Sequence, residues 1–167
     1  DSREENTRLF HQMAQKAVDT DPENPDAMSS LSMSYSIKKD LNKRLETAEK
    51  ALELNPSHPR SNFSYGQALT NFGRNEEALS YVKKAIELDP QSKRNYEGFF
   101  PLLYIALKDW ENAITWLNTA HERSPHSRYF GWKAAVYGKM NDLDSAKENL
   151  NSFLKERPEI KTLEDYE

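Results

Sequence analysis

Histidines and carboxylates are the side chains of this sequence best suited to acid–base or metal chemistry. The four histidines show no H-E-x-x-H spacing, and the two nearest in sequence, His121 and His126, lie on either side of Pro125 rather than on one helix face. The acidic residues are dispersed at spacings typical of solvated helix faces. The sequence therefore predicts no metal site and no catalytic pair of carboxylates.

Cysteine is absent, which excludes disulfides, thiolate nucleophiles and cysteine-ligated metals. The sequence also has no glycine-rich phosphate loop, dinucleotide fingerprint or G-x-S-x-G elbow. No cofactor is predicted, and the chain is not expected to be an enzyme. The N-x-S sequence at Asn62 falls within a predicted helix and is interpreted as a chance match to a glycosylation site.

Charge and hydropathy exclude two classes of partner. The formal net charge is −4, with acidic and basic residues interspersed, whereas a nucleic-acid-binding surface requires a dense basic face. No apolar run approaches the ~20 residues of a membrane-spanning helix, and no signal peptide opens the sequence. We expect neither nucleic acid binding nor a membrane span, and these features favour a cytoplasmic location.

Prolines recur with a period near 34 residues, each just after an amphipathic helical stretch. The successive spacings are 34, 34, 35 and 33 residues. This period indicates a helical solenoid, in which each repeat buries its apolar face against its neighbours. The five prolines are Pro22, Pro56, Pro90, Pro125 and Pro158.

The unit that ends at Pro90 resembles the tetratricopeptide repeat (TPR), with a turn at Gly73 between its two helices. Partial matches recur in the same register in the other units. Arg44 replaces a small residue of the pattern, which predicts a wider helix crossing or an arginine whose charged end reaches outwards. Pro101 lies inside a predicted helix, where a kink, a bulge or a late helix start is expected. The matching residues are Tyr65, Gly66, Leu69, Ala78, Val82, Ala85 and Pro90.

The resemblance implies an all-α fold, a right-handed α-α solenoid of about four helix pairs preceded by one further helix. We expect a single TPR domain over 1–167, with a half repeat at 1–22 and the start of a truncated helix at 159–167. The first helix of the third repeat is expected over 93–107. The chain is interpreted as a fragment of a larger protein, with open ends that self-associate. The repeats are expected at 25–56, 59–90, 93–125 and 127–158.

In TPR proteins, the first helix of each pair lines a concave groove that holds a peptide or helix of the partner. The resemblance therefore implies a non-catalytic scaffold for protein–protein interaction. The residues carried into this groove mix basic, amide and apolar side chains, which suits a partner segment with acidic and hydrophobic groups. They are Met33, Arg60, Phe63, Gln67, Asn71, Leu102, Arg128 and Trp132, with Ile37, Ile105 and Lys139 beside them.

The last third of the chain also resembles the TPR segments appended to bacterial class III adenylate or guanylate cyclases and to some transcriptional regulators. This resemblance rests on LKDWENAITWLNTAHERSP and on the stretch AAVYGKMNDLDSAKENLNSFLKERPEIKTLEDY that follows. It implies an alternative function, as a regulatory or oligomerisation module of such a protein. No cyclase residues are present.

Overall fold

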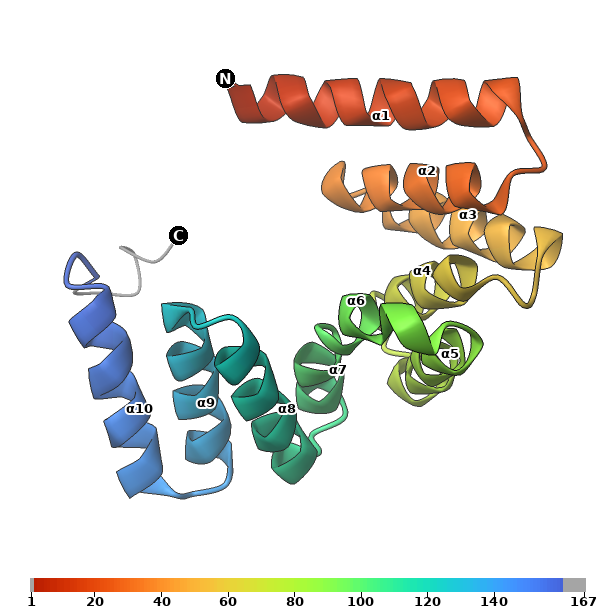
Figure 1. Cartoon of the computed structure of the whole chain (residues 1–167). Coiled ribbons are helices and arrows are strands. Elements are labelled where there is room, and N and C mark those ends of the chain that lie inside the picture. The colour runs from red at the N-terminus through yellow and green to blue at the C-terminus, as the bar shows by residue number, and fades with distance from the viewer. Residues whose placement is uncertain (1, 161–167) are drawn as a thin grey trace. The chain divides into compact units, whose positions relative to one another are not determined.

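The computed structural model describes residues 2–160, and all regular secondary structure in that range is helical (Figure 1). The predicted all-α fold class is therefore confirmed. The elements are α1 (Ser2–Thr20), α2 (Pro25–Ile37), α3 (Leu41–Leu54), α4 (Pro59–Thr70), α5 (Asn75–Leu88), the 3₁₀ turn η1 (Pro90–Ser92), α6 (Lys93–Glu97), α7 (Phe100–Ala106), α8 (Trp110–Arg123), α9 (Ser127–Lys139) and α10 (Leu143–Glu156).

The helices divide into two compact units, the first unit over Asp1–Glu97 and the second unit over Gly98–Glu167. In the first unit, each of the helices α1 to α5 packs against the next along the chain. In the second unit, α7 packs on α8, α8 on α9 and α9 on α10. That the whole chain is one repeat domain stays a prediction. The truncated helix expected at 159–167 lies largely outside the described residues.

The turn inside each helix pair contains one residue in the left-handed conformation. The φ angles are 60° at Lys39, 71° at Gly73, 58° at Lys108 and 62° at Asn141. Glycine adopts this conformation without steric cost, whereas the other three residues carry a Cβ there. In three of the four turns, the next residue is an aspartate whose side chain accepts a hydrogen bond from a backbone N–H in the first turn of the following helix. These aspartates are Asp40, Asp109 and Asp142.

Small residues allow the helices of a pair to approach closely, as expected at Gly66. A Cβ added to Gly66 would lie 3.0 Å from the carbonyl oxygen of Ala78 and 3.1 Å from a methyl carbon of Val82. Ala78 and Val82 are both fully buried. Even a methyl group at position 66 would therefore require its neighbours to shift by a few tenths of an ångström, and a larger side chain would force α4 and α5 apart.

Arg44 occupies the equivalent close approach between α2 and α3, and the structure shows how its bulk is accommodated. The hydroxyl of Ser32 donates to the carbonyl oxygen of Arg44 at 2.8 Å, so the two backbones remain near each other. The Arg44 side chain extends away, and its Nη1 donates to Asn71 Oδ1 at 2.6 Å. Burial lowers the pKa of Arg44. The charged end therefore reaches Asn71 with its Nε buried, so it lies only partly in solvent. The wider helix crossing stays a prediction.

Pro101 interrupts the helix that was expected over 93–107. The chain forms the short helix α6, leaves helical geometry at Gly98, and begins α7 at Phe100. Pro101 thus lies in the first turn of α7, where its missing N–H removes no intrahelical hydrogen bond. An irregularity was predicted at Pro101 as a kink, a bulge or a late helix start. The structure shows a break between α6 and α7 instead of a late start, because helical geometry already begins at Lys93.

Asn62 is fully buried in the column where the repeat pattern has tryptophan. Its Nδ2 donates to the carbonyl oxygens of Pro56 at 3.0 Å and of His58 at 2.9 Å. The amide therefore holds the approach to α4 in place and is not accessible for glycosylation, in agreement with the interpretation of the N-x-S sequence as a chance match.

We expect Asn62→Ala to lower the free energy of unfolding by about 1–3 kcal/mol, because the fully buried side chain makes two partly buried hydrogen bonds that alanine cannot make. The carbonyl oxygen of Pro56 loses this donor, whereas that of His58 keeps the backbone N–H of residue 62. Urea denaturation followed by circular dichroism measures this change. The exposed Asn151 on α10 provides a matched control, and Asn151→Ala should change stability by less than about 0.5 kcal/mol. Equal effects of the two substitutions would contradict the anchoring role of Asn62.

Candidate functional site

The first helix of the first complete pair leaves large apolar side chains exposed to solvent. On α2, Met33 is 42% exposed and Ile37 is 50% exposed. Because the two residues are four positions apart, they lie one helical turn apart on the same face. Gln67, on α4, is half-buried. The structure therefore gives α2 an exposed apolar face formed by Met33 and Ile37.

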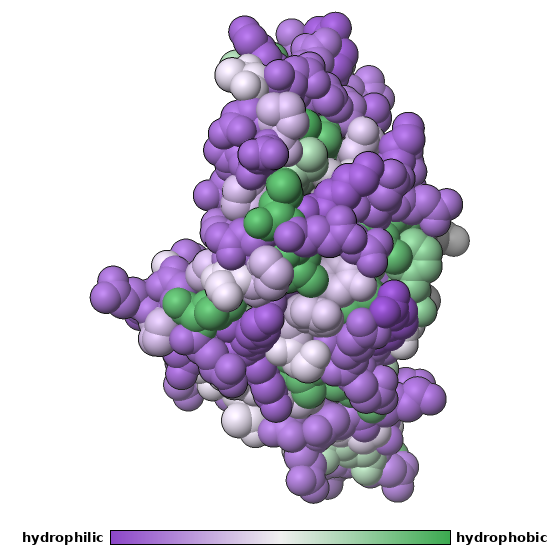
Figure 2. Space-filling view, turned by 90° about the vertical axis from the view of Figure 1, so that its right-hand side faces the viewer, coloured by the Kyte–Doolittle hydropathy of each residue, from purple (hydrophilic) through white to green (hydrophobic). Residues whose placement is uncertain are grey.

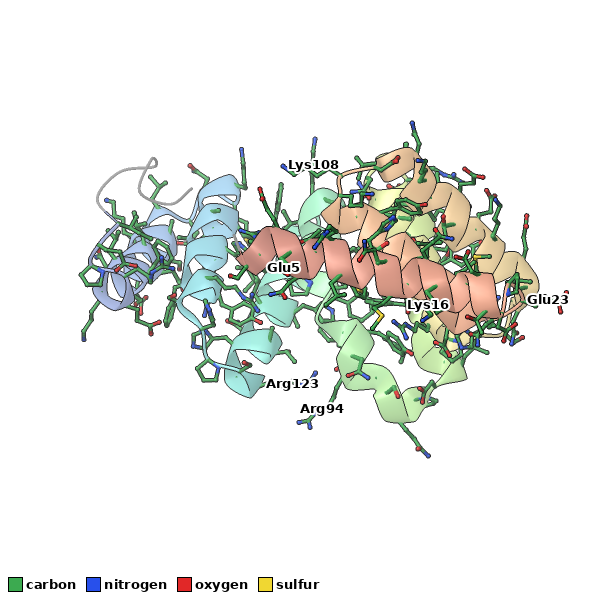
Figure 3. The ribbon with its side chains drawn as sticks, turned by 90° about the horizontal axis from the view of Figure 1, so that it is seen from above. Glu5, Lys16, Glu23, Arg94, Lys108 and Arg123 are labelled. Carbon is green, nitrogen blue, oxygen red and sulfur yellow. The ribbon has the colours of Figure 1, made fainter. Side chains whose placement is uncertain are left out.

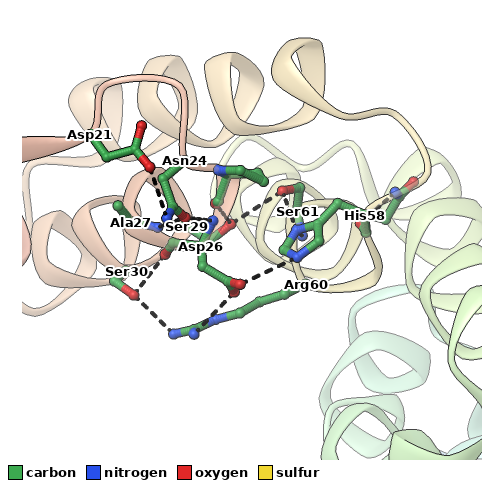
Figure 4. Close-up of polar contacts among 11 residues, drawn as sticks. Asp21, Asn24, Asp26, Ala27, Ser29, Ser30, His58, Arg60 and Ser61 are labelled. Carbon is green, nitrogen blue, oxygen red and sulfur yellow. Dashed lines mark hydrogen bonds and ion pairs between the residues drawn. The ribbon is translucent and has the colours of Figure 1, made fainter. Parts of the chain in front are cut away.

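Arg60 lies at the start of α4, but its charge already has partners on α2. The guanidinium donates to Asp26 Oδ1 at 3.4 Å and to Ser30 Oγ at 3.1 Å (Figure 4). The side chains of Arg60 and Asp26 are 45% and 56% exposed, and exposed ion pairs contribute only ~0–1 kcal/mol. Arg60 thus joins two first helices, and a carboxylate of a partner would have to compete with Asp26.

His58 reinforces this connection between α2 and α4. Its Nδ1 accepts a hydrogen bond from the backbone N–H of Ser61 at 3.3 Å, so His58 caps the N-terminus of α4. A neutral ring that accepts at Nδ1 carries its proton on Nε2. That nitrogen lies 3.5 Å from Asp26 Oδ2 (Figure 4), so the carboxylate of Asp26 faces both His58 and Arg60.

Two other predicted groove residues have structural contacts. The ring of Phe63 is half-buried and packs on Tyr96 of α6, with 4.9 Å between ring centroids. Burial raises the pKa of Tyr96. Asn71, at the end of α4, accepts the hydrogen bond from Arg44. Phe63 and Asn71 therefore support the packing of the first unit, and a role for them in binding stays a prediction.

The four histidines also have structural roles. His58 and His126 cap α4 and α9. The ring of His121 lies 4.6 Å from that of Phe130, and the ring of His11 packs edge-on against a tyrosine. Within residues 2–160, no group of three histidine, aspartate or glutamate side chains is placed to hold a metal ion.

A hollow of about 650 Å³ lies between α1 and the end of α2, and seven of its eight lining residues are polar or charged, among them Arg8, His11 and Lys38. His11 Nδ1 lies 2.8 Å from Ser34 Oγ. Burial, with smaller contributions from Lys38 and Lys43, lowers the pKa of His11, which favours a neutral ring at neutral pH. Of the residues that line this hollow, only Ile37 was predicted from the TPR pattern to lie in a binding groove.

The second unit contains an apolar pocket of about 280 Å³ between α7, α9 and the start of α8. The predicted site residues Leu102 and Trp132 form part of its wall, together with Ile105 and Lys139. Leu102 is 44% exposed. Three further residues of the pocket wall were not predicted from the TPR pattern, namely Trp110, Ala135 and Val136. For Trp110 the sequence does contain a signal, because it is an aromatic residue directly after the turn between two helices.

Arg128 lies near this pocket along α9 and is held by aromatic rings. Its guanidinium carbon is 5.1 Å from the centroid of the Tyr129 ring and 5.9 Å from that of Trp132. Its Nη2 donates to the Tyr129 hydroxyl at 3.3 Å. Tyr129 and Trp132 in turn meet edge to face, with 6.0 Å between centroids. Arg128 is therefore an exposed cation positioned on an aromatic surface.

The remaining surface is hydrophilic for the most part. On the face shown in Figure 2, apolar residues form small patches among polar ones. Charged side chains of both signs are exposed, for example Lys16 and Glu23 in the first unit and Lys108 and Arg123 in the second (Figure 3). None of the described helices combines the length and the apolarity that crossing a membrane requires.

Comparison with known families identifies the repeats. Two models of the tetratricopeptide repeat match the sequence, one over residues 25–58 and the other over residues 45–93. No curated relative matches the chain. The resemblance of the last third to segments appended to cyclases stays a prediction, because both matching models lie outside that third.

Solved structures of TPR proteins share the fold. PilW, a type IV pilus biogenesis factor, is 21% identical with a TM-score of 0.79, over 98% of this chain and 76% of PilW. YrrB, a TPR protein with an unusual peptide-binding site, is 19% identical with a TM-score of 0.69, over 94% of this chain and 81% of YrrB.

MamA from Desulfovibrio magneticus RS-1 is 14% identical with a TM-score of 0.69, over 93% of this chain and 97% of that structure. At these identities the likeness is one of fold alone. Together with the matching repeat models, it confirms that this chain contains tetratricopeptide repeats within an all-α, helical-repeat solenoid fold.

Proposed function

We propose that the chain is a non-catalytic scaffold that binds a protein or peptide segment on the first helices of its repeats, within either unit. Exposed apolar side chains also occur on second helices, so the observation that carries the proposal is their position. Met33 and Ile37 lie one turn apart on α2, and Leu102 lines the apolar pocket of the second unit. Exposed apolar area of this kind stabilises association when a partner covers it.

Known proteins with this fold support the proposal. TPR repeats are typical of non-enzymatic interaction proteins, and YrrB, which shares this fold, has a peptide-binding site. Basic residues near the apolar ones, Arg60 in the first unit and Arg128 in the second, favour a partner with acidic and hydrophobic groups. Of these two, Arg128 is the better candidate, because Arg60 already pairs with Asp26.

The regulatory or oligomerisation module of a bacterial cyclase or transcriptional regulator is the alternative proposed from the sequence, and no feature of residues 2–160 favours it. Self-association likewise stays a proposal. It would use the exposed Leu9 and Met13 of α1, which are 52% and 61% exposed, and Leu143 of α10, which is 57% exposed.

The proposed function is tested by placing negatively charged side chains on the apolar face of α2. We expect Met33→Asp combined with Ile37→Asp to weaken capture of a partner by about 30-fold, the effect of losing one hot-spot contact of ~2 kcal/mol. Capture from native extract, quantified by mass spectrometry, measures the loss for each captured protein.

The control places the same two charges on the second helix of the pair. Leu41 and Leu54 on α3 are 37% and 40% exposed, so Leu41→Asp combined with Leu54→Asp matches the change in charge and hydropathy. This control should capture the same proteins as the parent. Equal capture by the α2 variant and the parent would show that this face of α2 is not the binding surface.

A further inference from the structure

We propose that the apolar pocket of the second unit holds one bulky apolar side chain of an extended, acidic peptide segment, and that carboxylates on either side of that anchor bind Arg128 and Lys139. This inference rests on the proposed function and specifies the chemistry of the partner at one site. All residues involved belong to the second unit.

The size and lining of the pocket favour a single side chain as the occupant. Its volume of about 280 Å³ lies at the lower limit of the roughly 300–1,000 Å³ typical of small-molecule sites. Six of its seven lining residues are apolar, and Lys139 is the only charged one. A pocket with so few polar groups cannot orient a polar ligand, but it can desolvate an apolar anchor such as leucine or phenylalanine.

The charges next to the pocket lie along one face of α9. Arg128, Trp132, Ala135 and Lys139 follow one another at spacings of four, three and four residues, which keeps them on a single helical stripe. Trp132, Ala135 and Lys139 line the pocket. The two cations are eleven residues apart, which corresponds to about 16 Å along the helix axis.

Both cations are available to carboxylates of a partner. Arg128 and Lys139 are exposed, and among the described residues neither forms an ion pair. The contacts of Arg128 are with the rings of Tyr129 and Trp132 and with the Tyr129 hydroxyl. A guanidinium on an aromatic face is held in place yet keeps N–H donors for a carboxylate, which it binds in a bidentate fork.

The distance between the cations predicts the spacing of the acidic residues. An extended segment rises about 3.3 Å per residue, so about five residues span the 16 Å between Arg128 and Lys139. The partner should therefore carry an apolar residue with an aspartate or glutamate two or three positions before it and another two or three positions after it. Two isolated cations beside an apolar pocket do not form the dense basic face that nucleic acids require.

Selection from a phage-displayed library of random nine-residue peptides tests this proposal. The parent chain should enrich sequences with a central apolar residue flanked by acids about five positions apart. Arg128→Glu combined with Lys139→Glu should instead enrich the same apolar anchor with basic flanks. Lys147→Glu combined with Lys155→Glu, at exposed positions of α10, makes the same change in net charge and should keep the acidic flanks.

A substitution that fills the pocket provides a second test of the proposal. Ala135 is exposed and lines the pocket, so Ala135→Trp should fill it without disturbing the core. Isothermal titration calorimetry with the best enriched peptide should show binding at least about 30-fold weaker for Ala135→Trp than for the parent. An unchanged circular dichroism spectrum verifies that the helices of this variant remain folded.

Several results would overturn the proposal. They are the absence of enrichment, enriched sequences without acidic flanks, and equal binding of the acidic peptide by the charge-reversed or plugged variants. A second copy of the chain would be the occupant if the parent sediments as a dimer and Ala135→Trp as a monomer. If the α2 variant loses the peptide while the second-unit variants retain it, the scaffold function stands and this site is wrong. If capture from extract also fails to depend on α2, both proposals fail.

Discussion

Gly66→Leu is expected to lower the free energy of unfolding by about 3 kcal/mol, at the upper end of the cost of overpacking. The new side chain would begin 3.0 Å from the backbone oxygen of Ala78 and 3.1 Å from Val82. A backbone atom cannot move aside by changing rotamer, so α4 and α5 must separate. Ala78→Leu adds bulk to the same fully buried crossing and should have a similar effect.

Gly138→Leu is the control for this prediction. Gly138 also lies in a helix, but a Cβ added there has no neighbour within 4 Å. Because leucine is the better helix former, this variant should equal the parent or gain up to about 1 kcal/mol. Urea denaturation monitored by circular dichroism compares the three variants. Parental stability of Gly66→Leu and Ala78→Leu would show that the close crossing between α4 and α5 is misplaced.

Leu117→Ala is the second substitution with a large expected effect. Leu117 of α8 is fully buried, and truncating a buried leucine costs about 2–5 kcal/mol through lost burial and the cavity that remains. The midpoint of urea denaturation should fall while the dependence of the unfolding free energy on urea stays the same.

The matched control lies in the same unit. Leu102→Ala removes the same atoms from a side chain that is 44% exposed, so the loss of stability should stay below about 1 kcal/mol. The two leucines thus separate packing from proposed recognition, because Leu102 lines the pocket and Leu117 does not. Equal destabilisation by both substitutions would contradict the burial that distinguishes them.

The helical repeat could be predicted from the sequence because it depends on local patterns. The proline just after each helix pair and the helical periodicity before it are local signals, and their recurrence indicated where the helix pairs begin and end. Even the exceptions had local causes. Pro101 predicted a kink, a bulge or a late helix start, and the helix breaks just before it. Arg44 predicted a wider crossing or a charged end that reaches outwards, because its side chain is too long for the close approach.

The surface was harder to predict, because side-chain partners come from different repeats. Arg60 was expected to be available to a ligand, yet it pairs with Asp26, which occupies the same column one repeat earlier. A comparison of the charges at equivalent positions of neighbouring repeats would have revealed this pair. At the position equivalent to Arg128, the preceding repeat has the uncharged Asn95, so no such pair is expected there. The pocket residue Trp110 was missed because it belongs to a second helix.

The distribution of aromatic residues has a practical consequence. All three tryptophans, Trp110, Trp116 and Trp132, belong to the second unit. Intrinsic tryptophan fluorescence therefore reports on that unit alone, whereas the far-ultraviolet signal of the helices reports on both. Coincident transitions by the two probes would mean that the units unfold as one cooperative system. Separate transitions would give each unit its own stability, measurable in the intact chain without a label.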